Sequence, residues 1–266
     1  MTRRWWPGVR GAPPRAVSLG SRTLNETPEA GPRYRLGVLA FGDSITNGGG
    51  GLQWGVALQS WALWLARGLG LPFTGFAVDG AVAADVVARQ IPAYEARSAD
   101  PQARYQVGCL YVGVNDVRSP AWDPAAFEDD FRIALAFLAG RCDRTLAVTA
   151  PLRLGRPRTP AANVRELDAV VQRVADELEA LVVDLRALDA RNLLMADRVH
   201  PTAFGQVWIA ERALETLERD GLPGRVGPAS LISYRTTWVG RLRGDVTYAY
   251  RSLERYVGWL ASQAGR

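Results

Sequence analysis

A serine, an aspartate and a single histidine are the residues of this chain whose types and spacing could support nucleophilic catalysis. The stretch RLGVLAFGDSITNGGGG, residues 35–51, carries Ser44 directly after an apolar run. The only histidine, His200, lies three residues after Asp197 in ADRVHPTAFGQ. A carboxylate at this spacing can reach the imidazole Nδ1 and fix its tautomer, which leaves Nε2 to take a proton from a hydroxyl. This pattern predicts Ser44 as a nucleophile and His200 as its base.

The tetrahedral intermediate of such a reaction also needs hydrogen-bond donors for its oxyanion. The candidates are the backbone N–H of Ser44, the N–H of Gly80 in VDGAVAAD and the side chain of Asn115 in GVND. Each has an ordinary alternative: Ser44 could cap a helix, Gly80 could serve a turn, and Asn115 could form an Asx-turn. His200 alone could be a bystander. The combination favours catalysis over these separate explanations.

The elements that must position these residues follow from the apolar pattern. Continuous apolar runs predict strands at 35–41, 73–78, 106–112, 145–149 and 181–185. Helical spacing predicts helices at 52–69, 83–91, 124–138, 161–179 and 202–218. This alternation predicts a doubly wound α/β domain with a parallel sheet covered on both faces. Ligands of such sheets bind outside the carboxyl ends of the strands, where the candidate residues emerge.

Four sequence blocks resemble those of the SGNH hydrolases of the GDSL superfamily. They are FGDSI with Ser44, VDGA with Gly80, GVND with Asn115, and DRVHP with Asp197 and His200, in the family's order within residues 35–220. The resemblance implies a three-layer flavodoxin-like fold with a five-stranded parallel sheet. It also implies a serine esterase or lipase mechanism that uses neither a metal nor an organic cofactor.

The second block departs from the family pattern. The family usually has Ser or Asn before its glycine and Thr two positions after it, whereas this chain has Asp79 and Val82. An acid that faced the oxyanion would weaken the hole, so we expect Asp79 to point away. The chain also differs from the α/β-hydrolases, whose serine lies in G-x-S-x-G, because Thr46 occupies the position of the last glycine.

These residues predict an esterase that hydrolyses small to medium acyl esters through an acyl-enzyme, with a small-molecule ester as its substrate. Ser44 attacks the carbonyl, His200 takes the proton and returns it to the leaving alcohol, and Asp197 orients His200. An acyltransferase or thioesterase would use the same acyl-enzyme and stays an alternative. A non-catalytic carbohydrate-binding or lipid-binding module is a third hypothesis, against which the complete set of catalytic groups argues.

Three neighbouring features have two explanations each. Arg118, Arg153, Arg156 and Arg158 follow two strands and could favour anionic substrates as a rim, or could simply be solvated. Trp54, Trp61 and Trp64 could line an acyl pocket, although their helical spacing favours core packing. Glycines 48–51 either allow a close approach, form a mobile rim, or are a flexible linker.

Charge divides the chain into three parts. Arginines outnumber acids in residues 1–35 and 223–266, and acids outnumber arginines between them. We expect a basic N-terminal arm at 1–34, the hydrolase domain at 35–222, and a linker with a basic amphipathic helical extension at 223–266. This extension is predicted to dock on the acidic body of its own chain or of a homodimer partner. Contact with an anionic membrane surface is the alternative.

Cysteine usage and hydropathy bear on compartment and cofactors. Cys109 and Cys142 are too few for a disulfide framework and lack metal-ligand spacing, so we expect buried free thiols and, from them, a cytoplasmic location. No apolar run approaches the about 20 residues of a membrane-spanning helix. The N-terminus is too interrupted by Pro and Arg to read as a signal peptide. We expect no nucleic-acid partner.

Overall fold

The computed structural model describes residues 35–52, 56–98, 103–232 and 237–264. The chain divides into two units, 1–33 and 34–266, and only the second contains described residues. The predicted basic arm at 1–34 therefore lies outside the described residues.

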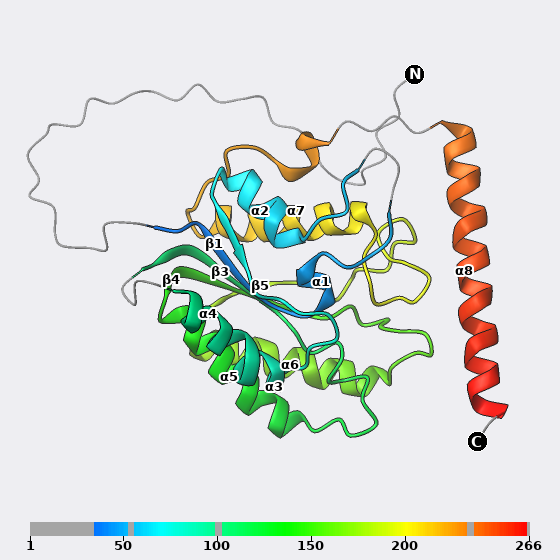
Figure 1. Cartoon of the computed structure of the whole chain (residues 1–266), viewed down its shortest axis with the longest axis horizontal. Helices are drawn as coiled ribbons and strands as arrows, with labels where there is room; N and C mark the ends of the chain where they lie inside the picture. The colour runs from blue at the N-terminus through cyan, green and yellow to red at the C-terminus, as the bar shows by residue number, and fades with distance from the viewer. Residues whose placement is uncertain (1–34, 53–55, 99–102, 233–236, 265–266) are drawn as a thin grey trace, which may run out of the picture. The chain divides into compact units, whose positions relative to one another are not determined.

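The second unit is built on a five-stranded parallel sheet (Figure 1). Its strands are β1 (Val38–Gly42), β2 (Phe73–Gly75), β3 (Tyr105–Tyr111), β4 (Cys142–Val148) and β5 (Leu181–Val183). They lie in the order β2-β1-β3-β4-β5, with Val38 opposite Phe73 on one side and Val107 on the other. This is the flavodoxin-like order, and it confirms the predicted fold class.

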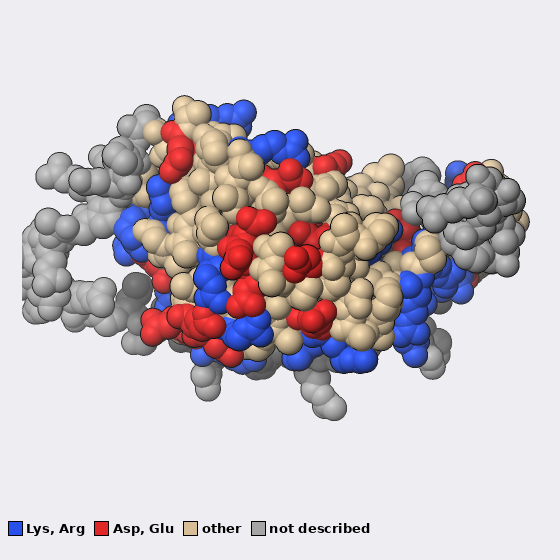
Figure 2. Space-filling view, turned by 90° about the horizontal axis from the view of Figure 1, so that it is seen from below, with Lys and Arg blue, Asp and Glu red and all other residues tan. Residues whose placement is uncertain are grey.

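Helices cover both faces of this sheet, which explains why its strands are apolar throughout. One face carries α2 (Trp61–Leu69) and α7 (Ala203–Arg219). The other carries α3 (Ala83–Asp85), the π-helix η1 (Val86–Gln90), α4 (Ile91–Arg97), α5 (Pro124–Ala139) and α6 (Ala161–Glu177). Phe41, Leu110 and Leu146 are fully buried between these layers. Acidic side chains gather on the outer surface of the second layer, with arginines among them (Figure 2).

The C-terminal part contains the 3-10 helix η2 (Pro228–Leu231) and the 27-residue helix α8 (Trp238–Ala264). An apolar stripe along α8 is exposed to solvent: Val239, Leu242, Val246, Tyr250, Leu253 and Val257. Among the described residues, no helix is both long and apolar enough to span a membrane. Docking of this helix on its own chain or on a homodimer partner, and its contact with a membrane surface, all stay predictions.

The helix predicted at 52–69 differs most from the structure. Residues 53–55 lie outside the described residues, and 56–60 are not helical, so the helix starts only at Trp61. Ser60 caps it, with its side chain accepting from the N–H of Ala62 at 3.2 Å. Residues 44–47 instead form the short helix α1 (Ser44–Asn47), which was not predicted.

Smaller differences concern the ends of elements. The strand predicted at 73–78 ends at Gly75, although its chain stays beside β1 through the bonds from Phe76 N to Ala40 O and from Val78 N to Gly42 O. The helix predicted at 83–91 is a succession of α3, η1 and α4. Cys109 and Cys142 are buried free thiols, as predicted.

Candidate active site

Ser44, His200 and Asp197 form a continuous hydrogen-bonded chain at the carboxyl ends of the strands. Ser44 Oγ lies 2.9 Å from His200 Nε2, and His200 Nδ1 lies 2.8 Å from Asp197 Oδ2. The Asp197 side chain is only 4% exposed, whereas that of His200 is 32% exposed. The carboxylate is therefore shielded from water while the imidazole remains accessible. These contacts fit a triad of nucleophile, base and orienting acid.

The sharp turn after β1 presents Ser44. Gly42 has φ +147°, and a Cβ on it would lie 2.2 Å from the carbonyl oxygen of Tyr111, so only glycine fits there. Asp43 then caps α1 by accepting from the N–H of Ile45 at 2.8 Å. Ser44 is thus the first residue of α1 and not its cap, contrary to the alternative explanation of this serine.

Asp43 is fully buried beneath the nucleophile. Burial raises its pKa to about 7, against the opposing effect of the Ile45 N–H and of nearby His200. Its second oxygen, Oδ2, has no hydrogen-bond partner among the residues that the structure describes. The carboxyl group next to Ser44 therefore takes up a proton near neutral pH.

The loop before α7 fixes the imidazole. Asp197 Oδ1 accepts from the backbone N–H groups of Val199 and His200, each at 3.1 Å, while Oδ2 holds the ring. Burial raises the pKa of Asp197, but the bonds from the His200 ring and the Val199 amide outweigh it, so this pKa lies below its ordinary value. Asp197 therefore stays ionised and keeps Nδ1 as the protonated nitrogen.

The two other predicted oxyanion donors lie on neighbouring loops. Gly80 has φ +77°, and a Cβ on it would meet nothing within 4 Å, so the backbone angle and not space favours glycine here. Asn115 Nδ2 donates to the carbonyl oxygen of Ala81 at 3.0 Å, which ties the loop after β3 to the loop of Gly80. Their role as oxyanion donors stays a prediction.

Asp79, the residue that departs from the family pattern, lies at the exposed surface. Its Oδ1 accepts from Asn47 Nδ2, at the last residue of α1, at 2.8 Å. The bond from Val78 N to Gly42 O, at 3.1 Å, places the loop of Asp79 beside the turn that presents Ser44. That Asp79 points away from the oxyanion stays a prediction.

The glycines after α1 make close backbone contacts with the segment after His200, and they are not a flexible linker. A Cβ on Gly50 would lie 2.1 Å from the carbonyl oxygen of Pro201, directly after His200. The N–H of Gly51 donates to Pro201 O at 3.2 Å, and Ala203 N donates to Gly51 O at 2.9 Å. The glycines thus let the segment after Ser44 pack directly against the segment after His200.

The arginine and tryptophan candidates separate clearly. Arg118, Arg153, Arg156 and Arg158 are all exposed, and Arg153 is paired with Asp189 at 2.7 Å. Their role as a substrate rim stays a prediction. Trp61 and Trp64 are buried, which confirms core packing, and Trp61 Nε1 donates to Thr46 Oγ1 at 3.2 Å. Trp54 lies outside the described residues.

Two buried glutamines that were not among the predicted site residues contact the turn that presents Ser44. Gln90 bonds both backbone groups of Gly42, and Gln206 bonds the carbonyl oxygens of Ile45 and Gly49. Their positions on the apolar faces of their helices were the available signal, because a buried amide must be hydrogen-bonded. Within the described part of the chain, no group of three or more His, Cys, Asp or Glu is arranged to hold a metal ion.

Comparison with solved structures supports the fold. LAE5, an alpha/beta hydrolase enzyme from the metagenome of Lake Arreo, is similar with 19% identity and a TM-score of 0.55, over 70% of this chain and 97% of that one. The acetylxylan esterase Axe2 from Geobacillus stearothermophilus is similar with 20% identity and a TM-score of 0.51, over 69% of this chain and 96% of that one. The acetyl xylan esterase AlAXEase is similar with 21% identity and a TM-score of 0.53, over 67% of this chain and 98% of that one. No curated protein sequence matches this chain.

A family model decides the classification. The model of the GDSL-like Lipase/Acylhydrolase family matches residues 40–208, a range that begins within β1 and ends within α7. It therefore contains Ser44, Gly80, Asn115, Asp197 and His200. The chain belongs to the GDSL-like lipase/acylhydrolase family and is a carboxylic-ester hydrolase of the SGNH type.

Proposed function

We propose that this protein is a serine esterase that hydrolyses small to medium acyl esters through an acyl-enzyme on Ser44. The observation that carries the proposal is the chain from Ser44 Oγ through His200 to Asp197, with distances of 2.9 and 2.8 Å. A base within hydrogen-bond reach of a hydroxyl, itself oriented by a carboxylate, is the arrangement that activates a serine.

In the first half-reaction, Ser44 Oγ attacks the ester carbonyl carbon while His200 Nε2 takes the hydroxyl proton. The carbonyl electrons move to oxygen and form the oxyanion. Its collapse breaks the bond to the alcohol, which receives the proton from His200 and leaves. In the second half-reaction, His200 takes a proton from water, the hydroxide adds to the acyl carbon, and Ser44 recovers its proton as the acid departs.

Three donors would stabilise the oxyanion. The N–H groups of a first helical turn lack partners within their helix, so the N–H of Ser44 at the start of α1 is one candidate. The second is the N–H of Gly80. Asn115 has two N–H bonds on Nδ2, and the contact with Ala81 O occupies one, which leaves the other for the oxyanion.

The test combines labelling with a substrate panel. A serine-directed phosphonate should label Ser44 and no other serine, and Ser44→Ala should fold as the native protein does but lose ester hydrolysis. Labelling elsewhere, or more than a few per cent of native activity in Ser44→Ala, would refute the proposal. A non-catalytic binding module predicts no hydrolysis by the native protein.

The substrate is the open part of the proposal. A chain-length series of p-nitrophenyl esters should show its highest kcat/KM at short to medium acyl groups. Acetylated xylo-oligosaccharides belong in the panel, because two similar structures are those of acetylxylan esterases. Acyl-CoA substrates with added alcohol acceptors test the thioesterase and acyltransferase alternative. A preference for them would replace hydrolysis of oxygen esters as the main activity.

A further inference from the structure

The backbone around Ser44 is held from two sides by buried glutamine side chains. We name residues 42–49, from Gly42 to Gly49, the nucleophile turn. Gln90 is 2% exposed and Gln206 is fully buried. The side-chain amides of both bond to backbone groups, and neither is bonded to Ser44 Oγ.

Gln90 holds the start of the nucleophile turn. Its Oε1 accepts from Gly42 N at 3.0 Å, and its Nε2 donates to Gly42 O at 2.8 Å. β2 ends at Gly75, so on the β2 side Gly42 has no partner within a strand. Val78, beyond the end of β2, still donates its N–H to Gly42 O. Gln90 thus takes the place of a strand partner at the residue that precedes Asp43 and Ser44.

The π-helix explains how Gln90 reaches this position. Gln90 is the last residue of η1, which lies between α3 and α4. π-helices are rare, and those that occur are often found at functional sites. This one directs an amide at the residue from which the nucleophile turn begins.

Gln206 holds the other end of the nucleophile turn. Its Nε2 donates to Ile45 O at 2.9 Å and to Gly49 O at 3.0 Å, and its Oε1 accepts from Trp61 N at 2.8 Å. Ile45 lies within α1, Gly49 lies just after it, and Trp61 is the first residue of α2, whose N–H has no partner within its own helix. Since Gln206 lies on α7, which follows His200, it links the two segments that carry nucleophile and base.

We infer that Gln90 and Gln206 are positioning residues that hold the nucleophile turn in register with His200. This inference rests on the proposed function. Both side chains act through the backbone and touch no reacting atom. A misplacement of about 1 Å between reacting groups can cost about 100-fold in rate, so a modest shift of the nucleophile turn would be measurable.

Replacing each amide by methionine tests the inference. Gln90→Met and Gln206→Met keep the length of the side chain but remove its hydrogen bonds. We expect kcat to fall about 10-fold to about 100-fold, with KM within about twofold, because geometry at the reacting atoms changes and substrate contacts do not. Phosphonate titration of active sites ensures that kcat refers to folded enzyme.

Gln106 provides the matched control at the other end of β1. Its Oε1 accepts from Gly37 N at 2.7 Å, so it also holds a glycine of the same chain segment. Gln106→Met should lower the melting temperature but leave kcat per titrated site unchanged. If the Gln90 and Gln206 variants behave like this control, the two glutamines are merely structural and the inference is wrong.

Glutamate at each position tests the two glutamines by different expected pH dependences of kcat. It also provides a second variant should a methionine variant fail to fold. In Gln90→Glu, a protonated carboxyl can accept from Gly42 N and donate to Gly42 O, so both bonds return, whereas the ionised form cannot donate. We therefore expect kcat relative to native to recover towards acid pH. Gln206 donates two bonds and a carboxyl has one proton, so Gln206→Glu should stay impaired at every pH.

The outcomes distinguish this inference from the proposed function. If Gln90→Glu is as impaired as Gln90→Met at the acid end of the range, the bonds to Gly42 do not set the rate. Loss of the proposed function would instead show as Ser44→Ala retaining native activity, whatever the glutamine variants do. Should Gln206→Met fail to fold, the Gln90 variants and the Gln106 control decide.

Discussion

The two ends of β1 share one structural device, but only one end carries chemistry. Gly37 before the strand and Gly42 at its end both have positive φ, +88° and +147°. A Cβ would lie 2.1 Å from a carbonyl oxygen at Gly37 and 2.2 Å from one at Gly42. A glutamine Oε1 accepts the N–H of each, Gln106 at one end and Gln90 at the other.

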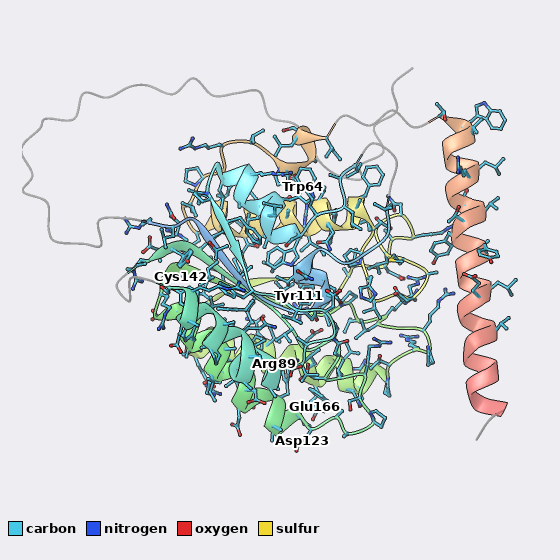
Figure 3. All side chains as sticks on the ribbon, viewed as in Figure 1. Trp64, Arg89, Tyr111, Asp123, Cys142 and Glu166 are labelled. Carbon is cyan, nitrogen blue, oxygen red and sulfur yellow. The ribbon has the colours of Figure 1, made fainter. Side chains whose placement is uncertain are left out.

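The ends differ in how their charges are placed. At the Gly37 end, Asp143 pairs with Arg35 and Arg104, and all three side chains are partly exposed. At the Gly42 end, Asp43 is fully buried and burial raises its pKa to about 7. Figure 3 labels Cys142 near the first end of the sheet and Tyr111 near the second.

Two further carboxyls repeat the pattern at the second end. Burial raises the pKa of Asp116 to about 6 and that of Asp168 to about 7. Each has one oxygen without a hydrogen-bond partner among the described residues. The difference teaches that a glycine held by a glutamine is only a way to fix the backbone. The chemistry comes from the residues that the fixed backbone presents at the second end, where Ser44 lies 2.9 Å from His200.

The largest expected effect is a loss of activity on mutation at the Gly42 end of β1, with none at the Gly37 end. His200→Ala should lower kcat on the order of 10⁵-fold to 10⁶-fold at every pH, because the serine loses its base. Asp143→Ala at the other end should leave kcat unchanged. Initial rates on a p-nitrophenyl ester across pH 5 to 9 measure both. More than about 1% of native kcat in His200→Ala would contradict the triad.

The second prediction concerns Asn115. Asn115→Ala should lower kcat about 100-fold to 1,000-fold with little change in KM, because the donor acts only as the oxyanion forms. The contact with Ala81 O is lost too, so circular dichroism must show an intact fold. An effect confined to KM would make Asn115 a substrate-binding residue.

A third prediction uses the raised pKa of Asp43. This pKa is about 7 in the folded protein against an ordinary value of 3.8, so between these pH values the folded state holds a proton that the unfolded state has released. Asp43 therefore contributes stability that is full below about pH 4 and is lost as the pH rises to about 7. Asp43→Asn keeps the cap of α1 but has no such proton.

The measurement is the free energy of unfolding from urea titrations at several pH values. The difference between Asp43→Asn and the native protein should move in favour of the variant from pH 4 to 7 and then level off. Asp184→Asn is the contrast, since Arg186 lowers the pKa of Asp184 and the native protein should lose stability relative to that variant as the pH falls. A pH-independent difference for Asp43→Asn would show that this carboxyl is not perturbed.

The sequence predicted the sheet and the Asp197–His200 pair from local signals, and it brought Ser44, 156 residues from His200, to the same site because parallel strands end at one edge of the sheet. Each strand is an apolar run, and Asp197 is only three residues from His200. The short helix α1 and the late start of α2 were missed, although Asp43 and Ser60 are local cap residues, and their contacts with Gln206, which is 161 residues from Ile45 and 145 from Trp61, could not be predicted from local sequence. The glycines after α1 were ambiguous for the same reason, since their partner is Pro201.

The smallest expected effect lies at the Gly37 end. Arg35 pairs with Asp143, but its side chain is 51% exposed, and exposed ion pairs contribute about 1 kcal/mol or less. Arg35→Ala should therefore change the free energy of unfolding by about 1 kcal/mol at most, and less at high salt. Asp143 keeps Arg104 at 3.5 Å, which reduces the loss further. The kcat should stay native because this pair lies at the opposite end of β1 from Ser44 and is not bonded to the residues of the site. A shift in kcat comparable to that of Gln90→Met would mean that the two ends of β1 are coupled.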